Sequence, residues 1–237
     1  MSVFKRTSDP ERIATRKLLN VPADATVFLN MNRNSQRKRL DLSVMAFARL
    51  VQKHPDRPLY LVFVTTVNPQ AGSYYNPVQM YLNELKSLGL DILKFGQRVI
   101  CVDTAPPKML DDKTIAAIYS ACDYGINTAN GEGFGLCQLE HLACGAPQVV
   151  IDVGDYGCFL TPETSEIVPA TIYEYLPMTA GIGSITKTAP VEEVAAAMDR
   201  ILAKKDVDAC IRVAESRPWS KICDPFLELV AGYNKDV

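Results

Sequence analysis

Residues 124–152 read YGINTANGEGFGLCQLEHLACGAPQVVID, and this stretch decides the fold. The apolar segment Tyr124–Thr128 predicts a short buried strand, and Gln148–Asp152 predicts a second one. Between them, Phe134–Cys144 reads as a helix, and Gly145 directly after it is a usual helix stop signal. A strand–helix–strand unit of this kind predicts two parallel strands joined by a right-handed crossover.

The same alternation continues on both sides of this unit. The further predicted strands are Thr26–Met31, Leu59–Thr66 and Arg98–Asp103, and the further predicted helices are Leu42–Leu50, Val78–Leu88, Thr114–Cys122, Val191–Ala203, Val207–Glu215 and Trp219–Ala231. Ser8–Glu11 predicts another helix start, with Asp9 as its cap, whereas residues 153–189 predict no element. We expect one domain over residues 1–237, an α/β fold with a doubly wound, Rossmann-like parallel sheet. Its core spans residues 25–204, and a helical C-terminal tail covers residues 205–235.

Composition excludes several classes of protein. The chain is 48% hydrophobic and 22% charged, which is ordinary for a globular protein. No apolar run approaches the ~20 residues of a membrane helix, so we expect no transmembrane segment. The seven cysteines form no Cys-x-x-Cys pair, and there are only two histidines. We therefore expect neither a disulfide framework nor a metal site, and a cytoplasmic location.

Positive charge gathers near the N-terminus. Residues 1–60 hold 12 Lys and Arg against 5 Asp and Glu, although the whole chain has a net charge of −2. Four of these cations lie between Arg33 and Arg39, where a strand ends and a helix begins. Helix N-termini attract anions, so the loop could bind a pyrophosphate. The alternatives are a solvated basic turn and a nucleic-acid-binding patch. We expect no nucleic acid among the binding partners, because the rest of the chain is acidic.

A glycine-rich loop follows the strand Tyr124–Thr128. Gly131, Gly133 and Gly135 would allow positive φ angles and a close backbone approach to a ligand. Glu140 lies about 7 Å along the following helix from Gly135, at 1.5 Å per residue, and its carboxylate could accept two hydroxyl hydrogen bonds. By itself this pattern is weak evidence, because glycines also serve plain turns and a glutamate near a helix start often only complements the helix dipole.

Both loops resemble one family. Glu132 and Glu140 in GEGFGLCQLEHLACGAPQVV resemble the E-x7-E signature of the retaining GT-B glycosyltransferases of the group 1 family. Arg33 and Lys38 resemble that family's Arg-x4-Lys element, and Ile118–Asp123 resembles the segment between the two motifs. The likeness covers residues 25–204, and FLNMNRNSQRKRLD is especially similar to glycosyltransferases encoded by large algal viruses.

The resemblance implies the C-terminal, donor-binding half of a GT-B fold and a role for each motif residue. It implies that Arg33 and Lys38 bind the diphosphate of a nucleotide-sugar, and that Glu132 contacts the donor sugar. The remaining substrate-binding residues implied by the resemblance are Gly133, Phe134, Gly135, Leu136 and Glu140, the last of these for the ribose. The reaction it implies is retaining transfer of a hexose from a UDP- or GDP-sugar, with no metal required and no cofactor.

Two departures from the family's motif affect the first loop, and one further feature affects the whole chain. Asn32 and Arg39 stand where the family usually has glycine, and asparagine tolerates left-handed backbone conformations. We expect the N-terminal acceptor-binding domain to be absent from these 237 residues and to act as a partner in cis or in trans, and we expect this half to be inactive alone. The alternative function is a non-catalytic nucleotide-sugar-binding module or regulatory subunit.

Overall fold

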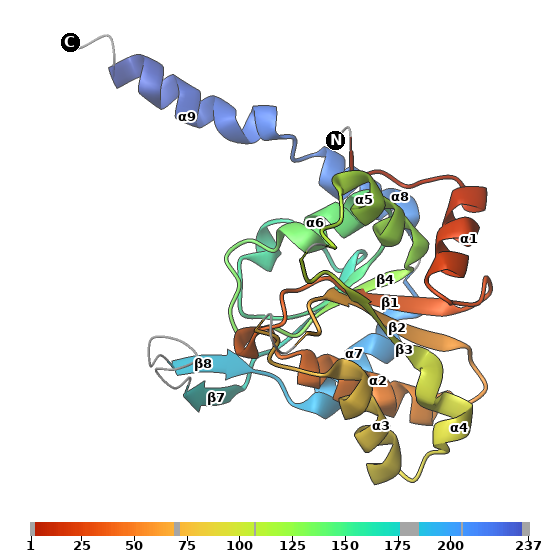
Figure 1. The fold of residues 1–237 in the computed structure, drawn as a ribbon. Coiled ribbons are helices and arrows are strands. Elements are labelled where there is room, and N and C mark those ends of the chain that lie inside the picture. Colours follow the sequence, from red (N-terminus) through yellow and green to blue (C-terminus); the bar gives the residue numbers. More distant parts are fainter. Residues whose placement is uncertain (1–2, 69–71, 107, 176–184, 205, 234–237) are drawn as a thin grey trace.

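A computed structural model describes residues 3–68, 72–106, 108–175, 185–204 and 206–233, apart from the side chains of Trp219, Ile222 and Tyr233. Six parallel strands form one sheet in the order β3-β2-β1-β4-β5-β6 (Figure 1). Their bounds are β1 Thr26–Asn30, β2 Leu59–Thr65, β3 Val99–Asp103, β4 Tyr124–Asn127, β5 Gln148–Ile151 and β6 Ser165–Val168. This is the predicted doubly wound order, in which the chain starts in the middle of the sheet and reverses direction after β3.

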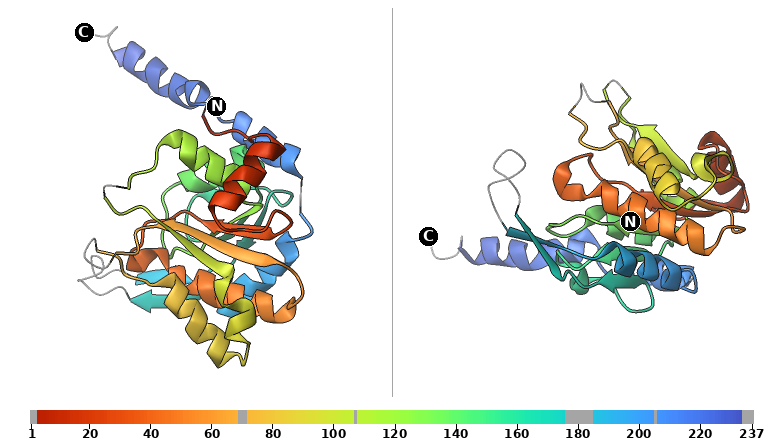
Figure 2. Two further views of the ribbon diagram at one scale, coloured as in Figure 1. Left: turned by 45° about the vertical axis from the view of Figure 1, so that its right-hand side comes forward. Right: turned by 90° about the horizontal axis from the view of Figure 1, so that it is seen from below.

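Helices cover both faces of the sheet (Figures 1 and 2). One layer contains α1 Asp9–Leu18, α5 Asp112–Ala121, α6 Leu136–Ala143 and α8 Val207–Glu215, and the other contains α2 Leu40–Lys53, α3 Pro77–Ser87 and α7 Val191–Ile201. Short helices Gln36–Lys38 (η1), Ile92–Phe95 (α4), Gly96–Arg98 (η3) and Tyr156–Cys158 (η4) complete the connections. The predicted helices and strands are therefore confirmed to within a few residues, and α4 is an addition.

Burial on both faces explains why the strands are so apolar. β2 is buried along nearly its whole length, as the near-continuous run Leu59–Thr65 predicts. At the centre of the sheet, Phe28 on β1 stacks on Tyr124 on β4 with ring centroids 5.2 Å apart. Gly125 faces Gln148 so closely that a Cβ atom would lie 1.9 Å from its side chain. A larger residue at this position would therefore have to displace the Gln148 side chain, which is buried and donates to the carbonyl oxygen of Ala146.

Helix α1 is fixed to the sheet by a buried arginine. Arg16 donates from Nε to the carbonyl oxygen of Ala121 at 2.8 Å, and from Nη2 to Asp123 Oδ2 at 2.8 Å. The predicted cap at Asp9 is wrong by one residue. Ser8 is the N-cap and forms a capping box with Glu11, in which the Ser8 amide donates to the Glu11 carboxylate at 3.0 Å.

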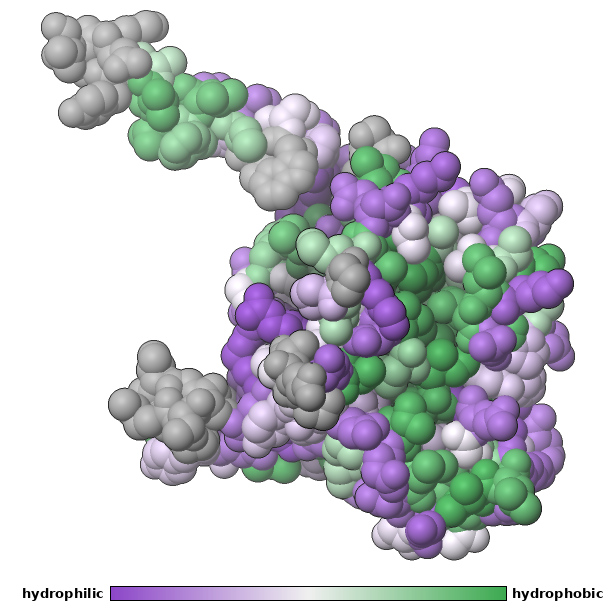
Figure 3. Space-filling view, in the orientation of Figure 1, coloured by the Kyte–Doolittle hydropathy of each residue, from purple (hydrophilic) through white to green (hydrophobic). Residues whose placement is uncertain are grey.

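The region without predicted elements holds a small hairpin as well as η4 and β6. Strands β7 Ile172–Tyr175 and β8 Ile185–Thr188 pair antiparallel and stand beside the carboxyl edge of the main sheet (Figure 1). At the other end of the molecule, α9 Trp219–Tyr233 extends away from the sheet, and apolar side chains gather on it (Figure 3). Among the described residues, no helix has the length and apolar character needed to cross a membrane.

Candidate functional site

The two motif loops meet between β1 and β4, where the strand order of the sheet reverses. β1 leads into α2 on one face, whereas its neighbour β4 leads into α6 on the opposite face. Loops that leave adjacent strands toward opposite faces leave a crevice between them, and ligands of doubly wound folds bind there. The strand order therefore brings residues 31–39 and 128–135 together at the carboxyl edge of the sheet.

Direct hydrogen bonds hold the two loops together. The amide of Asn130 donates to the carbonyl oxygen of Arg37 at 3.0 Å. Thr128 Oγ1 donates to the carbonyl oxygen of Arg39 at 2.7 Å and lies 2.7 Å from Ser43 Oγ on α2. Asn30 Nδ2 in turn donates to Ser43 Oγ at 2.9 Å. This buried polar chain fixes the spacing of the loops before any ligand is present.

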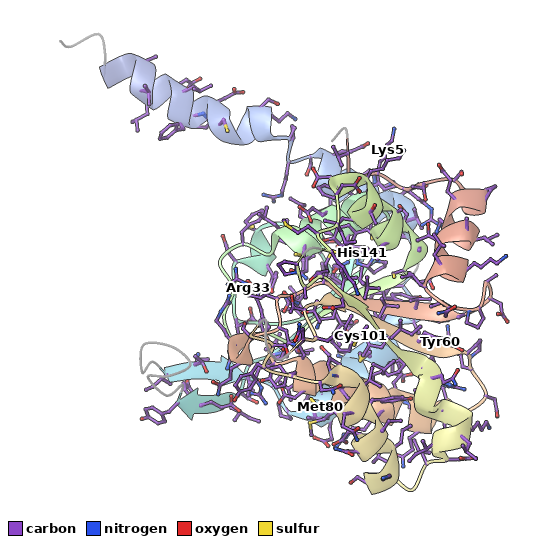
Figure 4. The ribbon with its side chains drawn as sticks, in the orientation of Figure 1. Lys5, Arg33, Tyr60, Met80, Cys101 and His141 are labelled. Carbon is purple, nitrogen blue, oxygen red and sulfur yellow. The ribbon has the colours of Figure 1, made fainter. Side chains whose placement is uncertain are left out.

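Two cationic side chains of the first loop, those of Arg37 and Lys38, lie at Glu132. Lys38, which is only 9% exposed, forms a direct ion pair with the Glu132 carboxylate, 94 positions away in sequence. Arg37 lies 3.8 Å from the same carboxylate and donates to the carbonyl oxygen of Gly131. Arg33 points outward at this edge (Figure 4), and its side chain makes no hydrogen bond or ion pair within the described part of the chain. Three cations thus accompany one carboxylate, which leaves the loop positive and suited to an anion.

A cavity of about 290 Å³ opens beside the Lys38–Glu132 pair. It is lined by Asn32, Lys38, Glu132, Phe134, Gly135, Leu136, Cys137 and Gln138. The first turn of α6 forms one wall, so its free backbone amides and the positive end of its dipole lie at the cavity. The structure therefore brings together five of the predicted site residues: Lys38, Glu132, Phe134, Gly135 and Leu136.

Only one of the three loop glycines uses a positive φ angle. Gly135 has φ of 90°, and a Cβ atom there would lie 2.5 Å from the ring of Tyr156. Gly131 and Gly133 do not have positive φ angles, so the expected use of positive φ is wrong at these two glycines. At Gly133 the space beyond the backbone is open, which leaves this part of the loop accessible.

In the first loop, Asn32 and Arg39 stand where the family usually has glycine, and only Arg39 has a left-handed backbone conformation. Asn32 does not adopt a left-handed conformation; it is buried, and its Nδ2 donates to Asn30 Oδ1 at 2.8 Å. Arg39 does adopt one, with φ of 46° and ψ of 49°. Ion pairs from its guanidinium to Asp41 and Glu174 hold it in this strained conformation.

Glu140 is placed differently from the other motif residues. It is not among the residues that line the 290 Å³ cavity, and its Oε2 accepts a hydrogen bond of 2.9 Å from the Tyr119 hydroxyl. Burial raises the pKa of the Glu140 carboxyl. Its neighbour His141 is buried inside the molecule (Figure 4), where burial lowers the pKa of the imidazole to about 3. A buried neutral ring is the structural role that we expect for such a histidine.

Asn127, whose side chain supports Glu132, was not identified from the sequence. Asn127, at the end of β4, donates from Nδ2 to Glu132 Oε1 at 3.0 Å and to the hydroxyl of Tyr156 at 2.9 Å. The same amide lies 3.2 Å from Gln138 Oε1. A polar residue at the carboxyl end of a buried strand was the available signal for Asn127. Tyr156 lies in the region without predicted elements and gave none.

Comparison with known proteins identifies the family and agrees with the fold. The family model described as glycosyl transferases group 1 matches residues 25–204. A D-inositol 3-phosphate glycosyltransferase from Saccharomonospora viridis is 26% identical over 232 residues, which are 95% of this chain and 47% of that protein. Anabaena HepE in complex with UDP and glucose is similar in fold, with 18% identity and a TM-score of 0.68 over 98% of this chain and 54% of that one.

A third comparison concerns a chain of similar extent. The C-terminal domain of a group 1 glycosyl transferase (LpcC) from Francisella tularensis has a TM-score of 0.61 and 16% identity, covering 90% of this chain and 91% of that one. By contrast, this chain spans less than half the length of the curated D-inositol 3-phosphate glycosyltransferases that it matches, 31% and 47% for two of them. With its family model matched from residue 25 to residue 204, the chain belongs to the group 1 glycosyltransferases.

Proposed function

We propose that this chain is the donor-binding half of a retaining glycosyltransferase, which binds a nucleotide-diphosphate sugar and transfers its hexose to an acceptor. The observation that carries the proposal is the meeting of Lys38 and Glu132 above the first turn of α6. A cation, a carboxylate and free backbone amides in one cavity match the diphosphate and the hydroxyl-rich sugar of such a donor. The UDP and the glucose in the Anabaena HepE complex correspond in chemical class to the nucleotide-diphosphate part and the sugar part of such a donor.

Each motif residue has a place in this proposal. Lys38 and Arg33 would hold the diphosphate and stabilise the negative charge that grows on the leaving phosphate, so the chemistry would need no metal ion. Glu132 and the amides of Gly133, Phe134 and Gly135 would contact the sugar, and Leu136 would pack beside the phosphates. Glu140 would accept the ribose hydroxyls with the carboxylate oxygen that Tyr119 does not use.

The ion pair between Lys38 and Glu132 has a consequence for binding. In the free chain Lys38 is neutralised by Glu132, so an incoming phosphate must share or replace this partner. Arg33 is exposed, does not line the cavity, and has no ion pair among the described residues, so it would be free to engage the phosphate first. The acceptor would be bound by a second, N-terminal domain in cis or in trans, in line with the half-length match to the curated relatives.

Calorimetry with UDP and with GDP tests the donor site. We expect one of them to bind, and Lys38→Ala to weaken that binding at least about tenfold, because a charge-assisted hydrogen bond to phosphate is lost. Lys86→Ala, at an exposed position on α3, is the matched control and should bind like the wild type. A folded sample that binds neither nucleotide contradicts the proposal. A non-catalytic module would bind the nucleotide but transfer no sugar when the acceptor domain is supplied.

A further inference from the structure

A second cavity, of about 510 Å³, lies on the other side of the first loop from the donor cavity. It is lined by Gln36, Arg39, Asp41, Tyr74, Tyr75, Asn130, Glu174 and Tyr175. Lys38 and Arg39 are neighbours in the chain but face different cavities, and so do Asn130 and Glu132. The two cavities therefore share the loops that hold the donor residues. We call the larger one the hairpin cavity, because strand β7 provides one wall.

Specific contacts fix the walls of the hairpin cavity. Arg39 Nη1 donates to Glu174 Oε2 on β7 at 2.6 Å, and Asn130 Nδ2 donates to Thr186 Oγ1 on β8 at 3.1 Å. These bonds hold the hairpin beside the loops. On the opposite side, Asn34 Oδ1 accepts from the amides of Tyr74 and Tyr75 at 3.1 and 2.7 Å. The cavity is thus supported from four separate parts of the chain: the first loop, Tyr74 and Tyr75, Asn130, and the hairpin.

The charge of the hairpin cavity differs from that of the donor cavity. Its one cation, Arg39, is paired with two carboxylates, Asp41 at 3.0 Å and Glu174 at 2.6 Å. The described lining residues therefore carry one more negative than positive charge. A phosphate would be repelled here, whereas Arg33, Arg37 and Lys38 attract it next door. A neutral ligand with several hydrogen-bond donors fits this cavity better.

Aromatic rings complete the chemistry. Tyr175 is 80% exposed and Tyr74 is 58% exposed, although both line a cavity. Tyr74 packs edge-on against Tyr75 with centroids 4.8 Å apart, so its ring has a fixed direction. Flat rings beside carboxylates and side-chain amides suit a sugar ring, whose C–H face packs on the aromatic face while its hydroxyls donate to Asp41, Glu174 and Gln36.

We propose that the hairpin cavity binds a neutral saccharide and so forms a second carbohydrate site beside the donor site. The binding is argued from the cavity alone. Its interpretation as the place of the acceptor sugar rests on the proposed function, because a transfer requires donor and acceptor to lie next to each other. In that case the chain would contribute to acceptor recognition as well as to donor binding.

Amide ¹H–¹⁵N NMR of the 237-residue chain, titrated with methyl α-D-glucopyranoside, tests the proposal. A single sugar ring should bind with a Kd on the order of 1–10 mM and shift the amides of Tyr74, Tyr75, Asn130 and Tyr175. Tyr175→Ala should weaken this binding about tenfold through the loss of the stacking ring. Tyr173→Ala is the matched control, since Tyr173 lies on the same strand, is 67% exposed and does not line the cavity.

Three results would overturn the proposal: no shifts at these residues, shifts confined to residues 132–138 of the donor cavity, or equal weakening by the two tyrosine variants. Inorganic phosphate shifting the hairpin-cavity residues would contradict the charge argument as well. The nucleotide titration keeps the two proposals separate. Sugar binding without UDP or GDP binding would disprove the proposed function but support the second site. Nucleotide binding without sugar binding would disprove the second site but support the proposed function.

Discussion

The side-chain amide of Asn127 donates to Glu132 Oε1 at 3.0 Å and thereby fixes the carboxylate that Lys38 pairs with. Asn127 Oδ1 is used too, since it accepts from the amide of Ala129 at 3.0 Å. The end of β4 thus orients the glycine-rich loop through one buried side chain. A loop that is positioned in this way needs less reordering when a ligand binds, which favours affinity.

Replacing Asn127 with aspartate tests this support. Asn127→Asp keeps the shape but places an oxygen opposite Glu132 and Gln138, so we expect the free energy of unfolding to fall by ~2 kcal/mol at pH 8. The loss should shrink at pH 5, because the neighbouring carboxylate raises the pKa of the new carboxyl and protonation restores a donor. Denaturant titrations at both pH values measure it, with Asn76→Asp at the exposed cap of α3 as control. An equal loss at the two pH values contradicts the charge argument.

The glycines of the loop should differ sharply in their tolerance of a methyl group. Gly135→Ala must accept φ of 90° and a Cβ atom 2.5 Å from Tyr156, so we expect a destabilisation of at least ~1–3 kcal/mol and loss of nucleotide binding. Gly133→Ala meets open space with an ordinary φ angle and should unfold like the wild type. Thermal unfolding of the two variants decides the matter. Similar melting temperatures for both would show that the backbone at Gly135 is not constrained as described.

Arg16 should contribute more to stability than any surface cation. Its side chain is 7% exposed and bonds to the carbonyl oxygens of Ala23, Ala25 and Ala121 as well as to Asp123. Arg16→Ala leaves these acceptors and a carboxylate without a partner, so we expect a loss of ~3 kcal/mol in the free energy of unfolding. Arg200→Ala, which breaks a pair whose arginine is 54% exposed, should cost less than ~1 kcal/mol. Chemical denaturation of both variants measures the contrast.

His141 predicts a pH dependence of stability. Its pKa is about 3 in the folded chain because the ring is buried, whereas an unfolded histidine titrates near 6.5. Below pH 6.5 the unfolded chain binds a proton that the folded chain refuses, so stability falls as the pH drops toward 3. Between pH 7 and pH 5 this amounts to about 2 kcal/mol. His141→Leu should reduce the pH dependence by that amount, and an unchanged dependence would mean that the histidine has the same pKa in the folded and the unfolded chain.

Much of the fold follows from local pattern. Leu59–Thr66 was predicted as a buried strand because so continuous an apolar run suits a strand covered on both faces, and β2 is Leu59–Thr65. The hairpin of β7 and β8 could not be predicted in the same way. Its strands are short and mostly exposed, and ion pairs and hydrogen bonds to distant residues hold it in place. Glu174 therefore gives no signal in the sequence, although it forms a wall of the larger cavity.

The candidate site divides along a similar line. The resemblance of Arg33, Lys38 and Glu132 to the family's motifs selected the two loops, and the structure places Lys38 on Glu132. The expected glycine angles were mostly wrong, because backbone conformation in a loop depends on what packs behind it. Tyr156 lies directly behind Gly135, and nothing comparable lies behind Gly133.

The sequence by itself determined the alternation of strands and helices, the family, and the two loops that carry its motifs, because these depend on neighbours within a few residues. The tertiary structure alone decided that Lys38 meets Glu132, that Asn127 supports the pair, and that Arg39 turns away to face Glu174. The contacts of Lys38 with Glu132 and of Arg39 with Glu174 span 94 and 135 positions. The first of them depends on the strand order that sets β1 beside β4 and sends their helices to opposite faces, whereas Asn127 and Glu132 are 5 positions apart and meet through the fold of their own loop. Local patterns do not encode that order, so they select the groups of the site but not the partners they meet.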